Sequence, residues 1–330
     1  MLYVDQPIGT GFSYGSDGAT STVVAAGYVW NMLQAFYAAF PAYTSRDFGL
    51  WTESYGGHYG PEFAAHIHEQ NARIDAGCLE GEKTNLVALG INNGWIHPET
   101  QHRSYADFAL RNNHRQLIGA DEHQKYVAAV DRDCVPAMQK CQGTTGSNSD
   151  CLKAADICAK AAEAPIEDAG DFNSYDVRVS PKSRDGPRDT HVGYLSNPEV
   201  QRAIGARQRY DECPDKPYMA MYNSGDDSRS FLGRLSTVVQ RGTNALIWAG
   251  DADWICNWMG NLEVADMVSH AKTDEFKNTT VSSYTVGGKQ YGEFKTAGSL
   301  SWLRVFDAGH EVPFYQPEVS LQAFKQIMQR

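Results

Sequence analysis

The sequence predicts an α/β fold in which a mostly parallel β-sheet is flanked by helices. Three stretches of strand length are apolar at most positions: residues 85–92, 244–250 and 302–306. Continuous apolar runs of this length are typical of strands that are buried on both faces, as in parallel sheets. Segments with helical periodicity alternate with these strands, and such alternation favours a parallel sheet.

The composition is that of a globular chain with a sizeable core. Of its 330 residues, 42% are hydrophobic and 21% are charged. The formal net charge of -11 argues against a basic surface for nucleic acid. No apolar run reaches the roughly 20 residues that a membrane-spanning helix needs. We therefore expect neither nucleic acid nor a membrane among the partners.

The chain begins directly in a strand-like stretch. Residues 1–14, MLYVDQPIGTGFSY, have the pattern of a strand and then a Gly-rich loop. They contain no charged n-region, no long apolar h-region and no cleavage site of a signal peptide. We expect the chain to be N-terminally truncated, with the first strands of the sheet and a signal peptide missing.

The following elements are predicted in chain order. Residues 22–40 have helical periodicity, and Pro41 ends the helix. The stretch DFGLW, at 47–51, is a short strand that leads into Glu-Ser-Tyr-Gly-Gly and another helix. The last helix is expected at 317–328. Its inward-facing residues are predicted to be Leu321, Phe324 and Met328.

The turn at Ser54 resembles a nucleophile elbow, in which a strained turn between strand and helix exposes a serine. The usual pattern is G-x-S-x-G; here Thr52 takes the first Gly position, while Ser54 and Gly56 fit. The alternative is an ordinary strand-to-helix turn with a capping serine.

Residues 97–225 differ from the rest of the chain, because they are polar and contain no comparable buried strand. We interpret them as a mainly helical cap inserted into a single domain, whose core comprises about 1–96 and 226–330.

Four cysteines cluster in this cap, at positions 134, 141, 151 and 158. Cysteines in loop-like sequence suggest disulfides and an oxidising compartment. A zinc site is the alternative, but no Cys-x-x-Cys or His pair supports it. Asn278 begins an N-x-S/T sequon and is a candidate glycosylation site.

Acidic and histidine side chains follow two of the predicted strands. A serine nucleophile needs a base to take its proton and an acid to orient that base. Asp251 and Asp253 come directly after strand 244–250, and His310 follows strand 302–306. The order Ser, Asp, His is that of the α/β-hydrolases. Either aspartate fits this pattern.

Four stretches of the chain resemble the serine carboxypeptidases, which are acid-active α/β-hydrolases, and the fit is closest to their fungal and yeast branch. The stretches are LYVDQPIGTGFSY, TESYGGHYGPEFA, AGDADWICNWMGN and DAGHEVPFYQPEVSL. The resemblance implies an α/β-hydrolase fold with a cap. It also implies an enzyme that needs no metal or other cofactor.

The resemblance also implies roles for individual residues. Ser54 would be the nucleophile, Asp253 rather than Asp251 the acid, and His310 the base. The amide of Tyr55 would be one donor of the oxyanion hole. Glu53 would hydrogen-bond the terminal carboxylate of the substrate through a shared proton, which favours acidic pH.

The resemblance further implies that Cys256 and Glu311 line the substrate pocket, and that Cys256 is a free thiol. Nested disulfides, Cys134–Cys158 and Cys141–Cys151, match the yeast members, and the two outer gaps are equal in length.

One family segment, Trp-x-Asn-Gly-Gly-Pro-Gly, would lie before Met1. It supplies the second oxyanion donor and an Asn for the terminal carboxylate. We therefore expect the chain by itself to be inactive or feeble, since one lost donor lowers turnover by about 10²–10³. The partner of Cys213 would lie in the same missing segment.

The predicted function is a serine-type carboxypeptidase that acts on peptide and protein C-termini at acidic pH through an acyl-enzyme. The alternatives are an acyltransferase or esterase on the same scaffold, or a catalytically inactive remnant. The expected location is the secretory pathway, with the protein secreted or in a vacuole or lysosome. The sequence leaves the oligomeric state open.

Overall fold

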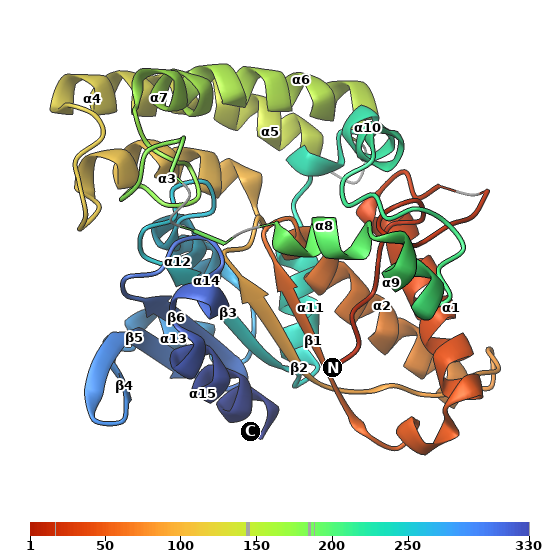
Figure 1. Ribbon diagram of the computed structural model, residues 1–330. Coiled ribbons are helices and arrows are strands. Elements are labelled where there is room, and N and C mark those ends of the chain that lie inside the picture. The colour runs from red at the N-terminus through yellow and green to blue at the C-terminus, as the bar shows by residue number, and fades with distance from the viewer. Residues whose placement is uncertain (17, 143–145, 184–185, 188, 330) are drawn as a thin grey trace.

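The computed structural model describes residues 1–16, 18–142, 146–183, 186–187 and 189–329. Within them the chain forms a mixed sheet in the order β1-β2-β3-β6-β5-β4 (Figure 1). The strands are β1 (Asp47–Glu53), β2 (Asn85–Asn92), β3 (Asn244–Gly250), β4 (Ser282–Val286), β5 (Lys289–Ala297) and β6 (Leu300–Val305). Neighbours among β1, β2, β3 and β6 are parallel, as predicted. The β4–β5 hairpin continues the sheet in antiparallel fashion and was not predicted.

Helices lie on both faces of the sheet and above it (Figure 1). They are α1 (Thr22–Ala39), α2 (Gly56–Asp75), α3 (Pro98–Arg111), α4 (Ala120–Ala129), α5 (Val135–Gln142), α6 (Asn148–Cys158), α7 (Ala164–Ala169), α8 (Thr190–Leu195), α9 (Pro198–Ala203), α10 (Asp215–Asn223), α11 (Leu232–Gln240), α12 (Trp258–Met267), α13 (Thr273–Asn278), α14 (Val312–Tyr315) and α15 (Pro317–Met328). Shorter helical turns are η1 (Pro41–Tyr43), η2 (Val130–Cys134), η3 (Ala159–Glu163) and η4 (Asp226–Ser228).

The sheet is buried on both faces, which explains its continuous apolar strands. In β3, Ala245 and Ile247 pack with α1, α2, α11 and α12 on one face. Leu246 and Trp248, which alternate with them, pack with α15 on the other face. Successive side chains of a strand point to opposite faces, so both sets have to be apolar.

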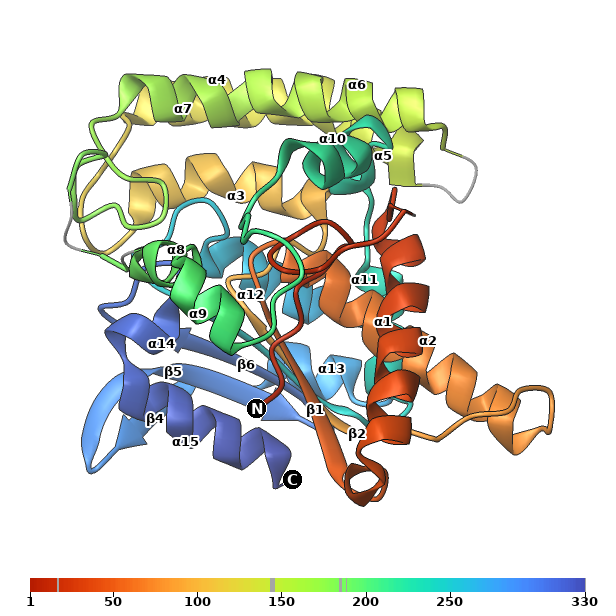
Figure 2. The ribbon, with the colours of Figure 1, turned by 45° about the vertical axis from the view of Figure 1, so that its right-hand side comes forward.

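A layer of helices, α4 to α7, lies above the edge of the sheet at which β1 and β2 end, with α3 between (Figures 1 and 2). The helix α3 packs on α12, which in turn packs on β3. Two disulfides, Cys134–Cys158 and Cys141–Cys151, join the segments of this layer, so both predicted pairs are present. Cys78, Cys213 and Cys256 are free, and only Cys256 is buried.

Two predictions about local structure were wrong. Residues 1–6 form no strand, and Leu2, Tyr3 and Val4 are exposed, because no strand of the described residues lies beside them to pair. In α15 the prediction failed for Leu321, which is 53% exposed; the buried residues are Val319, Ala323 and Ile327. Phe324 and Met328 do face the sheet as predicted, with Phe324 packed on the ring of Trp51.

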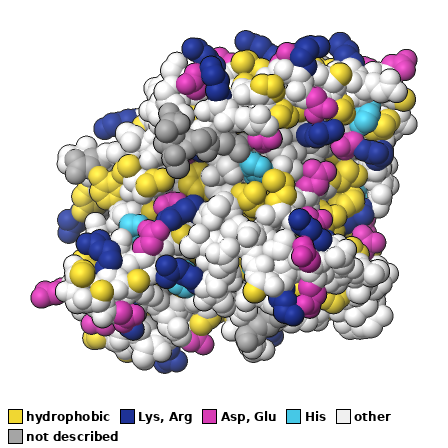
Figure 3. Space-filling view, turned by 180° about the vertical axis from the view of Figure 1, so that it is seen from behind, with side chains coloured by type: hydrophobic (Ala, Val, Ile, Leu, Met, Phe, Trp, Pro, Cys, Tyr) yellow, Lys and Arg dark blue, Asp and Glu magenta, His cyan; other side chains and the backbone are white. Residues whose placement is uncertain are grey.

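None of the helices in the described ranges is both long and apolar enough to cross a bilayer. Seen from behind, the surface carries acidic and basic side chains that are interspersed (Figure 3).

Candidate active site

Ser54 lies on a strained turn between β1 and α2. Its φ of 58° falls in the left-handed region, which residues with a side chain rarely adopt. Glycine is required at the two positions that follow Tyr55, because a Cβ at either position would collide with neighbouring atoms. A Cβ on Gly56 would lie 2.5 Å from Cβ of Thr52, and one on Gly57 would lie 2.5 Å from the backbone of Trp95. The sequence Ser-Tyr-Gly-Gly therefore lets the start of α2 approach the loop after β2 closely.

The backbone of Ser54 is held by that same loop. Its N–H donates to the carbonyl of Asn92 (3.0 Å), and its carbonyl accepts from the amide of Trp95 (2.9 Å). These bonds fix a turn that would otherwise relax, so the strain at Ser54 is maintained by its neighbours.

Tyr55 places a free amide at the start of α2. Within the described residues this N–H donates no hydrogen bond, and it adjoins Ser54 as an oxyanion donor must. The phenol of Tyr55 donates to Oδ2 of Asp226 (2.8 Å), which is fully buried. Asp226 also accepts from the amide of Thr22 (3.0 Å). Asp226 therefore ties the residue after Ser54 to the start of α1.

His310 and Asp253 are in contact, although 57 residues separate them. Nδ1 of His310 lies 3.0 Å from Oδ2 of Asp253, which is completely buried. The same oxygen accepts from the side chain of Asn93 (2.7 Å) and the amide of Cys256 (3.1 Å). Nε2 of His310 is buried and has no hydrogen-bond partner among the described residues. This is the nitrogen that an orienting acid leaves available for proton transfer.

The environment of His310 shifts its pKa in two directions. Burial lowers the pKa, but the charge and hydrogen bond of Asp253, with Glu53 and Glu311 nearby, raise it by more, so the pKa lies above its usual value.

Asp251 faces different partners. Its carboxylate contacts Nε2 of His114 (2.9 Å) and a guanidinium nitrogen of Arg304 (3.4 Å), and it accepts from the amide of Asp307 (2.9 Å). These bonds tie the ends of β3 and β6 to the loop after α3. No hydrogen bond or ion pair joins Asp251 to His310 within the described chain.

Glu53 is hydrogen-bonded to Asn92, a residue that the sequence had not singled out. Nδ2 of Asn92 donates to Oε2 of Glu53 (2.7 Å) and to the carbonyl of His310 (2.8 Å). Partial desolvation raises the pKa of Glu53 although much of the residue is exposed, while His310 and the Asn92 bond act in the opposite direction. A polar residue at the end of an apolar strand was the available signal for Asn92 and Asn93.

Cys256 and Glu311 both adjoin this group, since the amide of Cys256 donates to Asp253 and Glu311 directly follows His310. Cys256 is buried, and desolvation raises the pKa of its thiol well above the usual value. Glu311 is half-buried, and desolvation raises its pKa, opposed by His310 and supported by Asp189. Its carboxylate makes no hydrogen bond within the described residues, so it is not directed to a neighbouring donor.

One cavity lies away from this group of residues. This cavity, of about 560 Å³ between α15 and the β4–β5 hairpin, is lined by none of the candidate site residues. No cluster of His, Cys, Asp or Glu in the described ranges is arranged to hold a metal ion.

Comparisons with known proteins show the family and the fold. A serine carboxypeptidase family model matches residues 1–330. Carboxypeptidase S1 of Penicillium janthinellum is 53% identical over 330 residues, which are 100% of this chain and 78% of that protein. Carboxypeptidase Y of Komagataella phaffii is 35% identical over 97% of this chain and 60% of its own length.

A solved structure has the same fold. It is a prohormone-processing carboxypeptidase from Saccharomyces cerevisiae, with a TM-score of 0.78, 22% identity, and coverage of 98% of this chain and 73% of that one. The predicted α/β-hydrolase fold is thereby confirmed. From the family model and these relatives, we conclude that the chain belongs to the serine carboxypeptidase family, peptidase family S10.

Proposed function

We propose that this chain is a serine-type carboxypeptidase that releases C-terminal residues from peptides and proteins at acidic pH. The observation that supports this best is the Asp253–His310 pair, whose imidazole leaves a buried Nε2 without a partner, in a fold that holds Ser54 on a strained elbow.

In the proposed reaction, Oγ of Ser54 attacks the last peptide carbonyl while Nε2 of His310 takes the hydroxyl proton. The amide of Tyr55 donates to the oxyanion that forms. The C–N bond then breaks, and the leaving amino group takes the proton from His310. A water molecule, deprotonated by His310, attacks the acyl-enzyme ester. This step releases the shortened peptide and returns the proton to Ser54.

Glu53 and Asn92 would bind the terminal carboxylate of the substrate. Two carboxylates repel unless they share a proton, and a raised pKa keeps that proton on Glu53 to higher pH. Asn92 donates to both Glu53 and the carbonyl of His310, and these two bonds would hold the carboxylate-binding residue at a fixed distance from the proposed base.

Both kcat and KM are expected to rise as pH rises, for different reasons. The raised pKa of His310 means that the neutral base accumulates only above that pKa, so kcat should rise with pH. Glu53 loses its proton as pH passes its raised pKa, so KM for peptide acids should rise too. Rates measured from about pH 4 to pH 8 would check this. Glu53→Gln keeps a donor at every pH and should flatten KM alone; a KM that still rises equally in this variant would exclude Glu53.

Glu311 is expected to favour a basic leaving residue. A partly desolvated carboxylate beside the cleaved bond attracts Lys or Arg by on the order of 1–3 kcal/mol. In Glu311→Met, the ratio of kcat/KM for blocked peptides ending in Lys and in Leu should fall at least several-fold. An unchanged ratio would leave Glu311 without a role in choosing the leaving residue.

The proposal extends to architecture and location. We propose that residues 97–225 are a cap inserted into one domain with a core of about 1–96 and 226–330.

The two disulfides in this segment favour the secretory pathway, with the protein secreted or in a vacuole or lysosome. Asn278 is exposed at the end of α13, as a glycosylated asparagine must be.

A carboxypeptidase and an acyltransferase or esterase are distinguished by their products. The chain, and a chimaera that adds the part of the Penicillium relative outside the match, would be supplied with a blocked dipeptide and with an acyl-glucose ester. Release of free C-terminal amino acid supports our proposal, and acyl transfer from the ester alone would overturn it. A chain that neither turns over substrate nor reacts with a fluorophosphonate would be the inactive remnant.

A further inference from the structure

One short loop is bonded to all three residues of the proposed triad. It runs from Asn92, the last residue of β2, to Trp95, and we call it the β2 loop. Its two ends bond to the backbone of the proposed nucleophile, and the side chain of Asn92 donates to the carbonyl of His310. Nδ2 of Asn93 donates to Oδ2 of Asp253 (2.7 Å). The loop therefore contacts the nucleophile, the base and the acid at once.

Asn93 is held in a backbone conformation that few residues adopt. Its φ of 40° lies in the left-handed region, which asparagine tolerates better than most residues with a side chain. Its backbone amide donates to the carbonyl of Trp248 in β3 (2.8 Å), and its Oδ1 accepts from the amide of Gly250 at the end of that strand (3.0 Å). Asn93 is fully buried. These two bonds fix the side chain in the position from which Nδ2 reaches Asp253.

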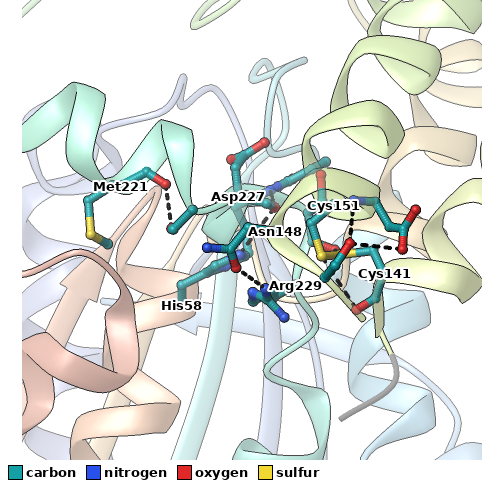
Figure 4. The surroundings of a disulfide bond; sticks show 12 residues. His58, Cys141, Asn148, Cys151, Met221, Asp227 and Arg229 are labelled. Atoms are coloured by element: carbon teal, nitrogen blue, oxygen red, sulfur yellow. Dashed lines mark hydrogen bonds between the residues drawn. A yellow bond between two sulfur atoms is a disulfide. The ribbon is translucent and has the colours of Figure 1, made fainter. Parts of the chain in front are cut away.

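The far end of the β2 loop is anchored as well. The carbonyl of Trp95 lies 2.5 Å from Nδ1 of His58 in α2, and Nε2 of His58 lies 3.3 Å from the carbonyl of Asp227. Figure 4 shows His58 and Asp227 near the Cys141–Cys151 disulfide, so this anchor lies beside the disulfide-linked helices. The loop is thus fixed on both sides of its second residue, which preorganises the side-chain amide there.

The carboxylate of Asp253 receives all of its bonds at one oxygen. Oδ2 accepts from Asn93 (2.7 Å) and from the amide of Cys256 (3.1 Å), and it faces Nδ1 of His310 (3.0 Å). Oδ1 is buried and has no hydrogen-bond partner in the described ranges. The bond from Asn93 is the shortest of the three. It therefore helps to determine which way the carboxylate turns, and it draws on the same negative charge that stabilises a protonated His310.

We propose that Asn93 is a positioning residue of the proposed reaction, which holds Oδ2 of Asp253 toward His310 and moderates the negative charge that His310 meets. This inference rests on the proposed carboxypeptidase function, in which His310 acts as the base. Asn93 is buried behind the acid, so its loss should be seen in kcat rather than in KM.

The test uses Asn93→Gly in the chimaera with the Penicillium relative. Glycine adopts a positive φ without strain, so this variant removes the side-chain amide and leaves the backbone as it is. We expect kcat to fall at least tenfold and up to about 10², as when a catalytic group is displaced by about 1 Å, while KM stays within about twofold.

Asn93→Asp separates the hydrogen bond from the shape of the side chain. It keeps the size of the side chain but replaces the donor with an acceptor, so it should lose at least as much kcat as Asn93→Gly. A kcat of Asn93→Asp within about twofold of the unmodified chimaera would show that the side chain only fills space, and would overturn the inference.

The pH dependence of kcat separates positioning from structural support. The groups that face His310 are Asp253 from the loop after β3, Glu53 from β1, the adjacent Glu311, and Tyr175 from the segment between α7 and α8. Of these groups, Asp253 is the one that Asn93 contacts. Without the Asn93 donor, Oδ2 offers more negative charge to the imidazolium. The pKa of His310 should therefore rise further, by about 1, and the pH of half-maximal kcat should rise with it.

Asn257→Ala is the matched structural control. Asn257 is buried four residues after Asp253, caps α12 by accepting from the amide of Gly260 (3.0 Å), and makes no hydrogen bond to Asp253 within the described residues. Its loss should lower the thermal unfolding midpoint and leave the pH of half-maximal kcat unchanged. A shift of this pH as large as that in Asn93→Gly would assign the effect to lost stability and contradict the proposed role.

An NMR titration of His310 tests the inference without turnover. In the Ser54→Ala chimaera, the imidazole resonance that disappears on His310→Gln reports the pKa of His310. A rise of about 1 on adding Asn93→Gly supports the inference even where no peptide is hydrolysed and the proposed function fails. A change of less than about 0.3 overturns it. If Asn93→Gly does not fold, Asn93→Asp provides the same readout, and an unchanged pKa there has the same consequence.

Discussion

In the chimaera that adds the remaining part of the Penicillium relative, Ser54→Ala is expected to lower kcat by on the order of 10⁶, the loss that follows removal of the serine or histidine of a catalytic triad. The reason is that the alanine variant has no hydroxyl to attack the carbonyl, while the elbow and the Asp253–His310 pair remain. Hydrolysis of a blocked dipeptide measures the loss, and His310→Ala should match it because the two residues act as a unit.

A fluorophosphonate probe provides the control for this result, because only an activated serine is labelled. The unmodified chain should be labelled, and Ser54→Ala should not, with the same thermal unfolding midpoint in both. Labelling that survives in Ser54→Ala would assign the reactive serine elsewhere and remove the basis of the proposed mechanism.

Asp253→Asn is expected to lower kcat by about 10⁴, since an amide no longer holds the imidazole in the required tautomer. Oδ2 of Asp253 accepts hydrogen bonds from Asn93 and Cys256 and also faces His310. An asparagine amide nitrogen at that position would face these hydrogen-bond donors and could not accept from them. The loss should be seen in kcat rather than in KM, because Asp253 lies behind the base and away from the substrate.

Asp251→Asn is the matched comparison, two residues away on the same loop. Asp251 contacts His114 and Arg304, and so its loss should lower the thermal unfolding midpoint while leaving kcat within about tenfold of the unmodified chain. A larger fall in kcat for Asp251→Asn than for Asp253→Asn would reverse the assignment of the acid.

The predictable parts of the site lie in short stretches with strong local patterns. The elbow could be predicted from consecutive residues, because a serine at positive φ needs a strand before it and small residues after it. The strands of the parallel sheet were predictable because burial on both faces makes every position apolar. Asn92 and Asn93 were missed, since a single asparagine at a strand end has many ordinary roles.

The sequence by itself determined the kinds of elements, their order and the short motifs that end the strands. Only the tertiary structure decided which of two neighbouring aspartates meets His310, because both follow the same strand and differ only in the direction in which the loop turns them. It also decided that Asn92 reaches His310 across 218 residues. Such contacts depend on strand order and on how the loops pack, and these are set by burial of the whole chain rather than by any local pattern.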